Sequence, residues 1–327
     1  MLCQMDLDAI YTSEWKQRIR DYFHVGKQFA PCAGGYWAFS FERQWHKHRA
    51  AVLKELQLVR TIAHWMPPAG REIVVFGSWL GAEAIAYALC GARVTAIDLD
   101  AAALGLSREL AARYGVPLRT LVMDASATSF ADDRFDLVSC SQVLEHLPPE
   151  RQPALVREMW RVCRPGGLLW LDTPNQFSYR DRHDTGMPLI HWLPRGVKTR
   201  LARRLRRDVP TSEPAFGYKN VGLHYYVSYL GLRKMLAGCG PCKVLSRYHG
   251  YADAEHYARQ RRCQGRARSP LFGIKLALLR AAMHVWNFNW LSDIKVVVRK
   301  LPAGKEEGQA ETATRRFGRR CRAATGA

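Results

Sequence analysis

Two glycines and an aspartate stand where the backbone must approach a ligand. Gly77 and Gly81 follow the apolar run at residues 73–76. Glycine at the first position permits a tight turn, and glycine at the second permits close contact between a helix and the strand before it. Asp98 ends the next apolar run, 21 positions after Gly77, at the offset where an acidic side chain accepts hydrogen bonds from ribose hydroxyls. These three residues alone do not identify the ligand.

The elements that would position these residues alternate between short β-branched runs and helical stretches. Such alternation predicts βαβ units and a mainly parallel sheet, with the carboxyl ends of its strands lining one ligand-binding edge. We therefore expect an α/β fold with a doubly wound, mainly parallel, seven-stranded sheet. Its strands are expected at 73–76, 93–97, 118–122, 135–140, 168–171, 243–248 and 294–299, with helices at 81–89, 101–114, 151–162 and 226–236.

The chain of 327 residues is long enough for one large core with appended elements. Residues 1–70 are rich in aromatic and basic residues and predict an N-terminal helical cap. The main domain is expected at 71–300, with a Pro- and Arg-rich insertion at 176–220 and a second insertion at 250–292. Residues 301–327 contain too few apolar residues to offset their ordering entropy, which predicts a disordered basic tail.

A series of short motifs follows the two glycines in order. Residues 123–125 read Met-Asp-Ala and residues 143–147 read Val-Leu-Glu-His-Leu, while Arg-Pro-Gly-Gly-Leu at 164–168 precedes the fifth strand and Thr-Pro-Asn at 173–175 follows it. With this set, the segment from about Arg71 to Asn175, together with the helix and strand at 225–248, resembles class I S-adenosylmethionine (SAM)-dependent methyltransferases of the ubiquinone-biosynthesis type. The resemblance implies a Rossmann-like methyltransferase fold and transfer of a methyl group from SAM to an acceptor.

The resemblance also implies a set of contacts with SAM. The glycine turn would face the methionine part of SAM, Asp98 would bind the ribose hydroxyls, and Asp124 would bind the adenine amino group. Leu99 and Ala125 would flank the adenine, and the two residues past the fourth strand would line the pocket near the sulfonium. Acidic and carbonyl groups suit a cationic sulfonium, and apolar walls suit an adenine ring. The expected cofactor-binding residues are Gly77, Ser78, Trp79, Gly81, Asp98, Leu99, Asp124, Ala125, Ser141 and Gln142.

Two positions depart from the family pattern. The family usually has an acidic residue two positions before its first glycine, where this chain has Val75, and a middle glycine where this chain has Trp79. The acidic residue commonly orients the SAM amino group, so that contact must come from backbone, water or another side chain. These departures leave open a SAM-fold binding protein that has lost catalysis. Asp98 and Asp124 likewise have an alternative role as caps of turns at strand ends.

Three histidines are the candidate catalytic bases for an acceptor that must lose a proton. His146 follows the fourth strand, whereas His183 and His191 belong to the insertion that begins past the fifth strand, near the ligand-binding edge. Methyl transfer is an in-line displacement on a carbon activated by positive sulfur, so positioning can supply much of the catalysis. Each histidine has the alternative of a structural role. The pair Cys239 and Cys242 lacks the further ligands of a zinc site, and no metal is expected.

The formal net charge of +20 suits an anionic partner, either nucleic acid, a phosphorylated substrate or an acidic membrane surface. Basic clusters at 195–207 and 259–268 lie outside the motif-bearing segment. We expect the acceptor to be a small molecule or a lipid-linked metabolite, with transfer to oxygen favoured. An RNA methyltransferase is the alternative, although the chain has no recognisable RNA-binding module and no Asn-Pro-Pro-Tyr type of motif after the fourth strand.

Residues 271–290 predict an apolar helix interrupted by Lys275 and Arg280, which make it too polar for a membrane span. This helix either packs on the domain or contacts an anionic membrane surface or lipid acceptor. The nine scattered cysteines fit a reducing compartment, and residues 1–10 lack a signal pattern. We therefore expect a cytoplasmic protein, peripheral to the membrane if the helix contacts lipid.

Overall fold

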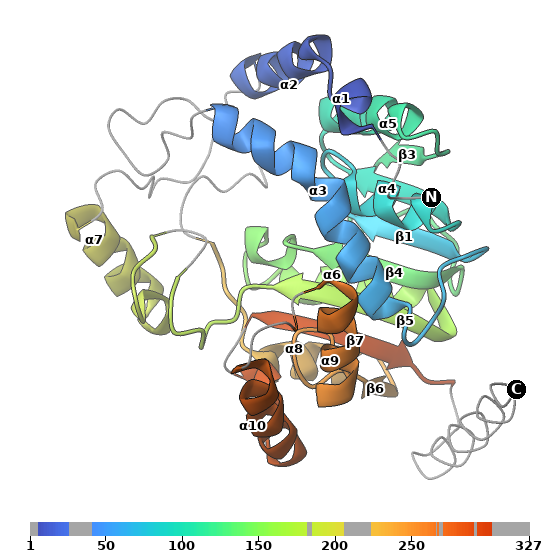
Figure 1. Ribbon diagram of the computed structural model, residues 1–327. Helices are drawn as coiled ribbons and strands as arrows, with labels where there is room; N and C mark the ends of the chain where they lie inside the picture. The colour runs from blue at the N-terminus through green and yellow to red at the C-terminus, as the bar shows by residue number, and fades with distance from the viewer. Residues whose placement is uncertain are drawn as a thin grey trace, which may run out of the picture.

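The computed structural model describes residues 6–25, 41–181, 185–205, 224–265, 267, 271–290 and 293–302. Its centre is a seven-stranded sheet in the order β3-β2-β1-β4-β5-β7-β6, with helices on both faces (Figure 1). The strands are β1 (Glu72–Phe76), β2 (Arg93–Asp98), β3 (Arg119–Val122), β4 (Phe135–Ser141), β5 (Cys163–Thr173), β6 (Cys242–Val244) and β7 (Ile294–Lys300).

Strands β1 to β5 pair in parallel, and β7 runs antiparallel to both β5 and β6. The central strands read as continuous apolar runs because both of their faces are covered by helices; Ile73, Val74 and Val75 are all buried. The mainly parallel, doubly wound seven-stranded sheet expected from the sequence is confirmed.

Two layers of helices cover the sheet. On one face lie α3 (Phe41–Ile62) and α4 (Ala82–Leu89), whose buried side chains form a cluster around Trp170 of β5. The opposite face is covered by α6 (Gln152–Val162) and α8 (Tyr229–Ala237), packed on Val138 and Leu169. The sheet is therefore the middle layer of three, and its carboxyl edge is left for ligands.

The N-terminal helices α1 (Leu7–Ile10) and α2 (Ser13–Val25) pack on α5 (Ala101–Arg113) at the β3 side of the sheet (Figure 1). Trp15 is fully buried there, and its indole Nε1 donates to Nε2 of His48 over 3.2 Å. Burial lowers the pKa of His48 to about 4, so the imidazole is neutral near pH 7 and can accept this hydrogen bond. The contact fixes α2 against α3.

The two insertions hold short helices beside the sheet. The first contains the 3₁₀ turn η3 (Ile190–Trp192) and α7 (Arg195–Leu205), and the second contains α9 (Ala254–Cys263), α10 (Leu271–Val285) and η4 (Phe288–Trp290). In Figure 1, α7 lies at the left and α10 at the bottom, away from the layered centre. Within the described residues, no helix combines the length and apolar character needed to cross a membrane.

Several expected elements differ in extent from the sequence-based expectation; strand β5, expected at 168–171, spans Cys163–Thr173. Strand β6 ends at Val244 rather than residue 248. Beyond it the hydroxyl of Ser246 accepts from the amide of Val297 over 3.0 Å, and the chain then turns through His249 and Gly250, both with positive φ. Helix α8 begins at Tyr229 rather than 226, where the Ser228 hydroxyl caps it by accepting from the amide of Gly231 over 3.0 Å. Helix α10 ends at Val285, and the remaining residues to Trp290 include the separate turn η4.

Gly81 opens α4 with a left-handed backbone, φ being 79°. A Cβ at this position would overlap the hydroxyl of Ser107 and would lie 2.8 Å from the Ser107 Cβ on α5. The sequence correctly indicated a close approach at Gly81, but the partner is the neighbouring helix and not the preceding strand.

Replacing Gly81 with alanine should therefore lower the free energy of unfolding by about 2 kcal/mol or more, because left-handed strain and steric overlap act together. The matched control is Gly105→Ala within α5, where an added Cβ meets nothing within 4 Å. That control should be neutral or stabilise by up to about 1 kcal/mol. Urea unfolding of both variants measures the difference, and equal stabilities would contradict the packing at Gly81.

Candidate functional site

The turns that follow β1, β2, β3 and β4 meet at the carboxyl edge of the sheet, because parallel strands deliver their carboxyl ends to one side. Two backbone hydrogen bonds join neighbouring turns. The amide of Ser78 donates to the carbonyl of Ile97 over 2.9 Å, and the amide of Met123 donates to the carbonyl of Asp98 over 3.1 Å. The turns after β1, β2 and β3, which carry most of the cofactor-binding residues expected from the sequence, are thus joined to one another.

The turn after β1 has a left-handed backbone at Gly77 and Trp79, with φ of 66° and 46°. A Cβ on Gly77 would overlap a methyl group of Val143, so only glycine fits beneath the loop that follows β4. Between them Ser78 is buried, and its hydroxyl has no hydrogen-bond partner among the residues that the structure describes. An unpaired buried hydroxyl in a backbone turn is a feature that a bound polar ligand would satisfy.

The carboxylate of Asp98 joins this turn to the one after β2. Its Oδ2 accepts from the amide of Trp79 over 2.7 Å, and its Oδ1 accepts from the amide of Asp100 over 3.0 Å. Asp98 therefore caps turns at the strand ends, which is the alternative to its role in binding a ribose. Because a carboxylate oxygen can accept more than one hydrogen bond, the same geometry also permits contact with ligand hydroxyls.

Trp79 ties the glycine turn to α2. Its indole Nε1 donates to the hydroxyl of Tyr22 over 2.9 Å, and that hydroxyl donates to Oδ2 of Asp100 over 2.8 Å. The rings of Trp79 and Phe23 lie 6.0 Å apart, while the Trp79 side chain stays 42% exposed. The substitution at the family's middle glycine is thus part of a contact between the cap helix and the site. The pairing could not be read from the sequence, in which 57 positions separate Tyr22 from Trp79.

Asp124, after β3, is also held by local donors. Its Oδ1 accepts from the amide and hydroxyl of Ser126 over 2.8 and 2.7 Å, and Nη2 of Arg151, at the start of α6, lies 3.2 Å from its Oδ2. Leu99 is exposed and Ala125 half-buried on the adjoining turns. Asp124 therefore also caps a turn at a strand end. It contacts the basic side chain of Arg151 as well, which the sequence motif did not indicate.

Ser141, which ends β4, and Gln142, which follows it, have different surroundings. The hydroxyl of Ser141 accepts from the indole Nε1 of Trp170 over 3.0 Å, which directs it to the face covered by α3 and α4. Gln142 has a left-handed backbone with φ of 57° and lies at the surface. Its amide donates to the carbonyl of Asp172 over 2.7 Å, and its Nε2 donates to Oδ1 of the same residue over 3.0 Å.

A buried carboxyl group, Glu83, lies directly behind this edge and was missed by the sequence analysis. It accepts a hydrogen bond from the hydroxyl of Ser139, whose strand position pairs with Val75 of β1. An acidic group therefore occurs on α4, beside the strand position where the family usually has one. Burial, followed by the nearby Glu55 carboxyl, raises the pKa of Glu83 from 4.5 to about 7. The available indication was a glutamate inside the apolar helix Ala82–Leu89.

The candidate bases differ in their surroundings. His146 is half-buried past β4 and packs edge-on against His224, with ring centroids 4.5 Å apart. His191 is buried in the first insertion, with Nε2 2.6 Å from the carbonyl of Ser178 and its ring 5.1 Å from that of Tyr226. Such contacts fit a structural role for His191, which is the alternative to a catalytic role. His183 lies outside the described residues.

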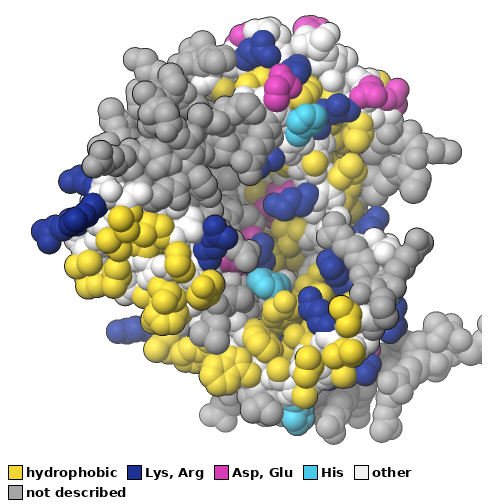
Figure 2. Space-filling view, turned by 60° about the vertical axis from the view of Figure 1, so that its left-hand side comes forward, with side chains coloured by type: hydrophobic (Ala, Val, Ile, Leu, Met, Phe, Trp, Pro, Cys, Tyr) yellow, Lys and Arg dark blue, Asp and Glu magenta, His cyan; other side chains and the backbone are white. Residues whose placement is uncertain are grey.

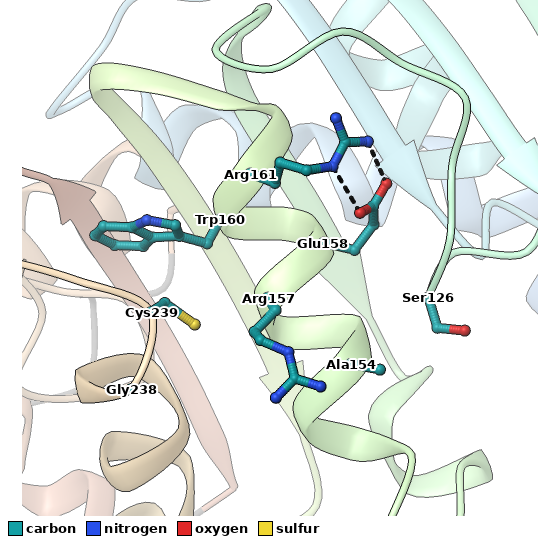
Figure 3. A pocket seen from close by; sticks show the side chains of 8 residues that line it. All are labelled: Ser126, Ala154, Arg157, Glu158, Trp160, Arg161, Gly238 and Cys239. Atoms are coloured by element: carbon teal, nitrogen blue, oxygen red, sulfur yellow. Dashed lines mark hydrogen bonds and ion pairs between the residues drawn. The ribbon is translucent and has the colours of Figure 1, made fainter.

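A surface hollow of about 440 Å³ lies elsewhere, along α6 and the end of α8 (Figure 3). Two of its three charged side chains pair with each other, since Nε and Nη2 of Arg161 contact the Glu158 carboxylate over 2.9 and 2.6 Å. It does not include the glycine turn or Asp98. No group of three metal-ligating side chains occurs among the residues for which the structure gives a placement. The residues lining the hollow are Ser126, Ala154, Arg157, Glu158, Trp160, Arg161, Gly238 and Cys239.

Comparison with known proteins places a methyltransferase domain over this edge. Residues 75–171 match the family model described as a methyltransferase domain. Ubiquinone biosynthesis O-methyltransferases from Pseudomonas putida and Aeromonas salmonicida are 32% and 36% identical over 110 and 109 residues. These matches cover 33% of this chain and 46% and 44% of the relatives, so the chain spans less than half of their length. The domain that the sequence motifs indicated is confirmed for this segment.

Solved structures of similar fold include magnesium protoporphyrin IX methyltransferase from Synechocystis PCC 6803 with bound SAH. It is 17% identical with a TM-score of 0.45, covering 70% of this chain and 92% of that one. The YcgJ protein from Bacillus subtilis is 16% identical with a TM-score of 0.45, covering 77% of this chain and all of that one.

The buried carboxyl of Glu83 predicts a pH-dependent stability. Because its pKa is raised in the folded chain, the folded state holds a proton that the unfolded state has lost between pH about 4.5 and about 7. Its contribution to the free energy of unfolding therefore falls as pH rises through this window. Glu83→Gln keeps a neutral hydrogen-bonding group and should be more stable than wild type at pH 8, by at most about 3 kcal/mol.

At about pH 4, below the pKa of this carboxyl in both states, the two proteins should be equally stable. Urea unfolding at both pH values measures the change, and Glu109→Gln on the exposed side of α5 is the control, with no pH-dependent gain expected. A Glu83→Gln chain that is less stable than wild type at pH 8 would contradict the neutral, buried carboxyl.

Proposed function

We propose that this chain transfers a methyl group from SAM to an acceptor bound at the carboxyl edge of β1, β2 and β4. The observation that carries the proposal is the turn from Gly77 to Gly81 held by the Asp98 carboxylate, inside the segment that matches a methyltransferase domain. A backbone turn with a buried hydroxyl and an adjoining carboxylate suits a ligand with both a polar amino-acid end and ribose hydroxyls.

The residues present fit SAM. The unpaired hydroxyl of Ser78 and the backbone of the glycine turn would hold the methionine part, and Asp98 would accept from the ribose hydroxyls. Exposed Leu99 and half-buried Ala125 would flank the adenine, with Asp124 close by to accept from its amino group. When bound, SAM supplies a methyl group on a positively charged sulfur, which an acceptor nucleophile attacks in line.

Helix α2 would close the cofactor side of this site. Tyr22 and Phe23 meet Trp79 at the rim of the glycine turn, and the Tyr22 hydroxyl bridges Trp79 to Asp100. The carboxylates that would hold the ribose and the helix that would cover it are therefore joined by hydrogen bonds. Trp79, which departs from the family pattern, becomes a positioning residue and not a defect.

The acceptor in this proposal is a small molecule or a lipid-linked metabolite, methylated on oxygen. Support comes from the O-methyltransferases that match the domain segment. Approach of the acceptor from the β4 and β5 side would bring it past His146, the half-buried histidine that packs edge-on against His224. His146 would take the acceptor proton, while His191 would hold the insertion in shape through Ser178.

Calorimetry with SAM and with S-adenosylhomocysteine tests the cofactor site directly. Asp98→Ala should weaken binding about tenfold or more, because hydrogen bonds to a charged group contribute about 1.5–3 kcal/mol. The matched control is Asp132→Ala, an exposed aspartate in the turn before β4 that pairs with Arg161, and it should leave affinity unchanged.

A folded Asp98→Ala variant with wild-type affinity would overturn the assignment of Asp98. Failure of the wild-type chain to bind SAM at millimolar concentration would overturn the whole proposal and favour the alternative of a binding protein without catalysis.

A further inference from the structure

The first insertion presents apolar side chains to solvent. On α7, Val197 and Leu205 are exposed and Leu201 is half-buried, at spacings of four that place them along one side of the helix. Ala202 is buried against Ile190 of η3, and Leu201 packs against the same pair, so these contacts hold the helix in place. Val197 and Leu205 are left exposed. Leu189, Trp192 and Leu193 extend the exposed stripe around η3.

Helix α10 is apolar on two faces and uses only one of them for packing. Leu276, Leu279 and Met283 are buried against α9. On the outer face, Leu271, Ile274 and Leu278 are exposed at 68%, 61% and 67%. An ordinary protein surface has single, scattered apolar residues. Large exposed aliphatic side chains that repeat at helical spacing instead indicate an interaction surface.

Contacts through the loop after β5 join η3, which precedes α7, to η4, which follows α10. The Asn175 side chain donates to the carbonyls of Asn289 and Trp290 over 3.0 and 2.9 Å. Two residues later, Phe177 meets Trp192 edge-on, with ring centroids 5.8 Å apart. The exposed rings of Trp192 and Trp290 thus flank the junction. Figure 2 shows hydrophobic side chains gathered at the left and along the lower part of one face, where α7 and α10 lie.

The charge of this surface has one sign. Residues 185–205 and 271–290 contain no aspartate or glutamate. Arg200, Arg203 and Arg204 are exposed along α7, and Lys275 is exposed on α10. Arg280 is paired with Glu255 of α9 over 2.5 Å and contributes less. Amphipathic helices bind anionic bilayers through exposed aliphatic residues, tryptophans at the border of the apolar face, and arginines without interspersed acidic residues.

We propose that η3, α7, α10 and η4 form a docking surface for an anionic phospholipid bilayer, named here the apolar-basic face. The outer residues of α7 and α10 insert among the headgroups, and the arginines meet the lipid phosphates. A single-stranded nucleic acid would use the arginines and aromatic rings but would leave Ile274, Leu278 and Val197 exposed to water. The first insertion follows β5 directly, so docking would bring the carboxyl edge of the sheet near the membrane.

The test uses the full chain and vesicles of phosphatidylcholine with or without 30 mol% phosphatidylglycerol, a composition chosen at roughly the charge of anionic bilayers. Co-sedimentation should show binding to the anionic vesicles and little to the neutral ones, weakening as salt rises. No SAM or acceptor is needed, so the outcome is independent of the methyl-transfer proposal.

Two pairs of variants locate the surface. Ile274→Ser with Leu278→Ser, and Arg200→Gln with Arg204→Gln, should each reduce partitioning about tenfold or more. The matched controls are Leu53→Ser on α3 and the pair Arg108→Gln with Arg119→Gln near β3, exposed residues away from the apolar-basic face. Both controls should stay within about twofold of wild type.

Absence of binding to anionic vesicles would overturn the proposal. So would equal losses in the control variants, since binding would then follow net charge alone. If a single-stranded RNA binds more tightly than the vesicles, and the serine variants leave both affinities unchanged, the surface is a nucleic-acid site and the membrane assignment is wrong.

Discussion

The hydrogen bonds of the Asp98 carboxylate hold together the turns on which the whole site depends. One oxygen fixes the amide of Trp79 in the glycine turn, and the other fixes the amide of Asp100 at the start of α5. Asp100 in turn caps α5 and accepts from Tyr22 of α2. One side chain at the end of β2 therefore links β1, α5 and the N-terminal helices. A carboxylate is suited to this role because it can serve several donors at once.

Behind this edge lies a buried polar network that the core must accommodate. Glu83 contacts Ser139, Trp170 donates to Ser141, and Asp172 forms an ion pair with Lys295 over 2.6 Å. Polar groups in such a setting are stable only when they are hydrogen-bonded. The network fixes the end of β4 from beneath, because Gln142 is bound to Asp172 by both its amide and its side chain. The site is thus supported by polar contacts across three strands and α4.

Local patterns in the sequence were enough to predict the sheet, its strand types and the turn at Gly77. Apolar runs, glycines and strand-end aspartates are encoded within a few residues of each other, so periodicity and spacing suffice. The contact of Tyr22 with Trp79 and the position of Glu83 beside Val75 depend on which helix packs where. The Tyr22–Trp79 contact and the Ser139–Glu83 hydrogen bond join residues 57 and 56 positions apart in the chain, so no local pattern reports them. The sequence did not indicate the contact of His191 with the Ser178 carbonyl, and the catalytic role of His191 stays a prediction.

We propose that a SAM-like ligand occupies the glycine turn and that α2 closes on it. Hydrogen–deuterium exchange of the full chain with and without S-adenosylhomocysteine tests both parts in one measurement. The ligand should slow amide exchange at residues 77–81, at 98–100 and in α2. In Tyr22→Phe the slowing in α2 should diminish while that at 77–81 persists. Protection confined to α6 and the turn after α8, around Ser126 and Cys239, would contradict the account by moving the ligand to the hollow of Figure 3.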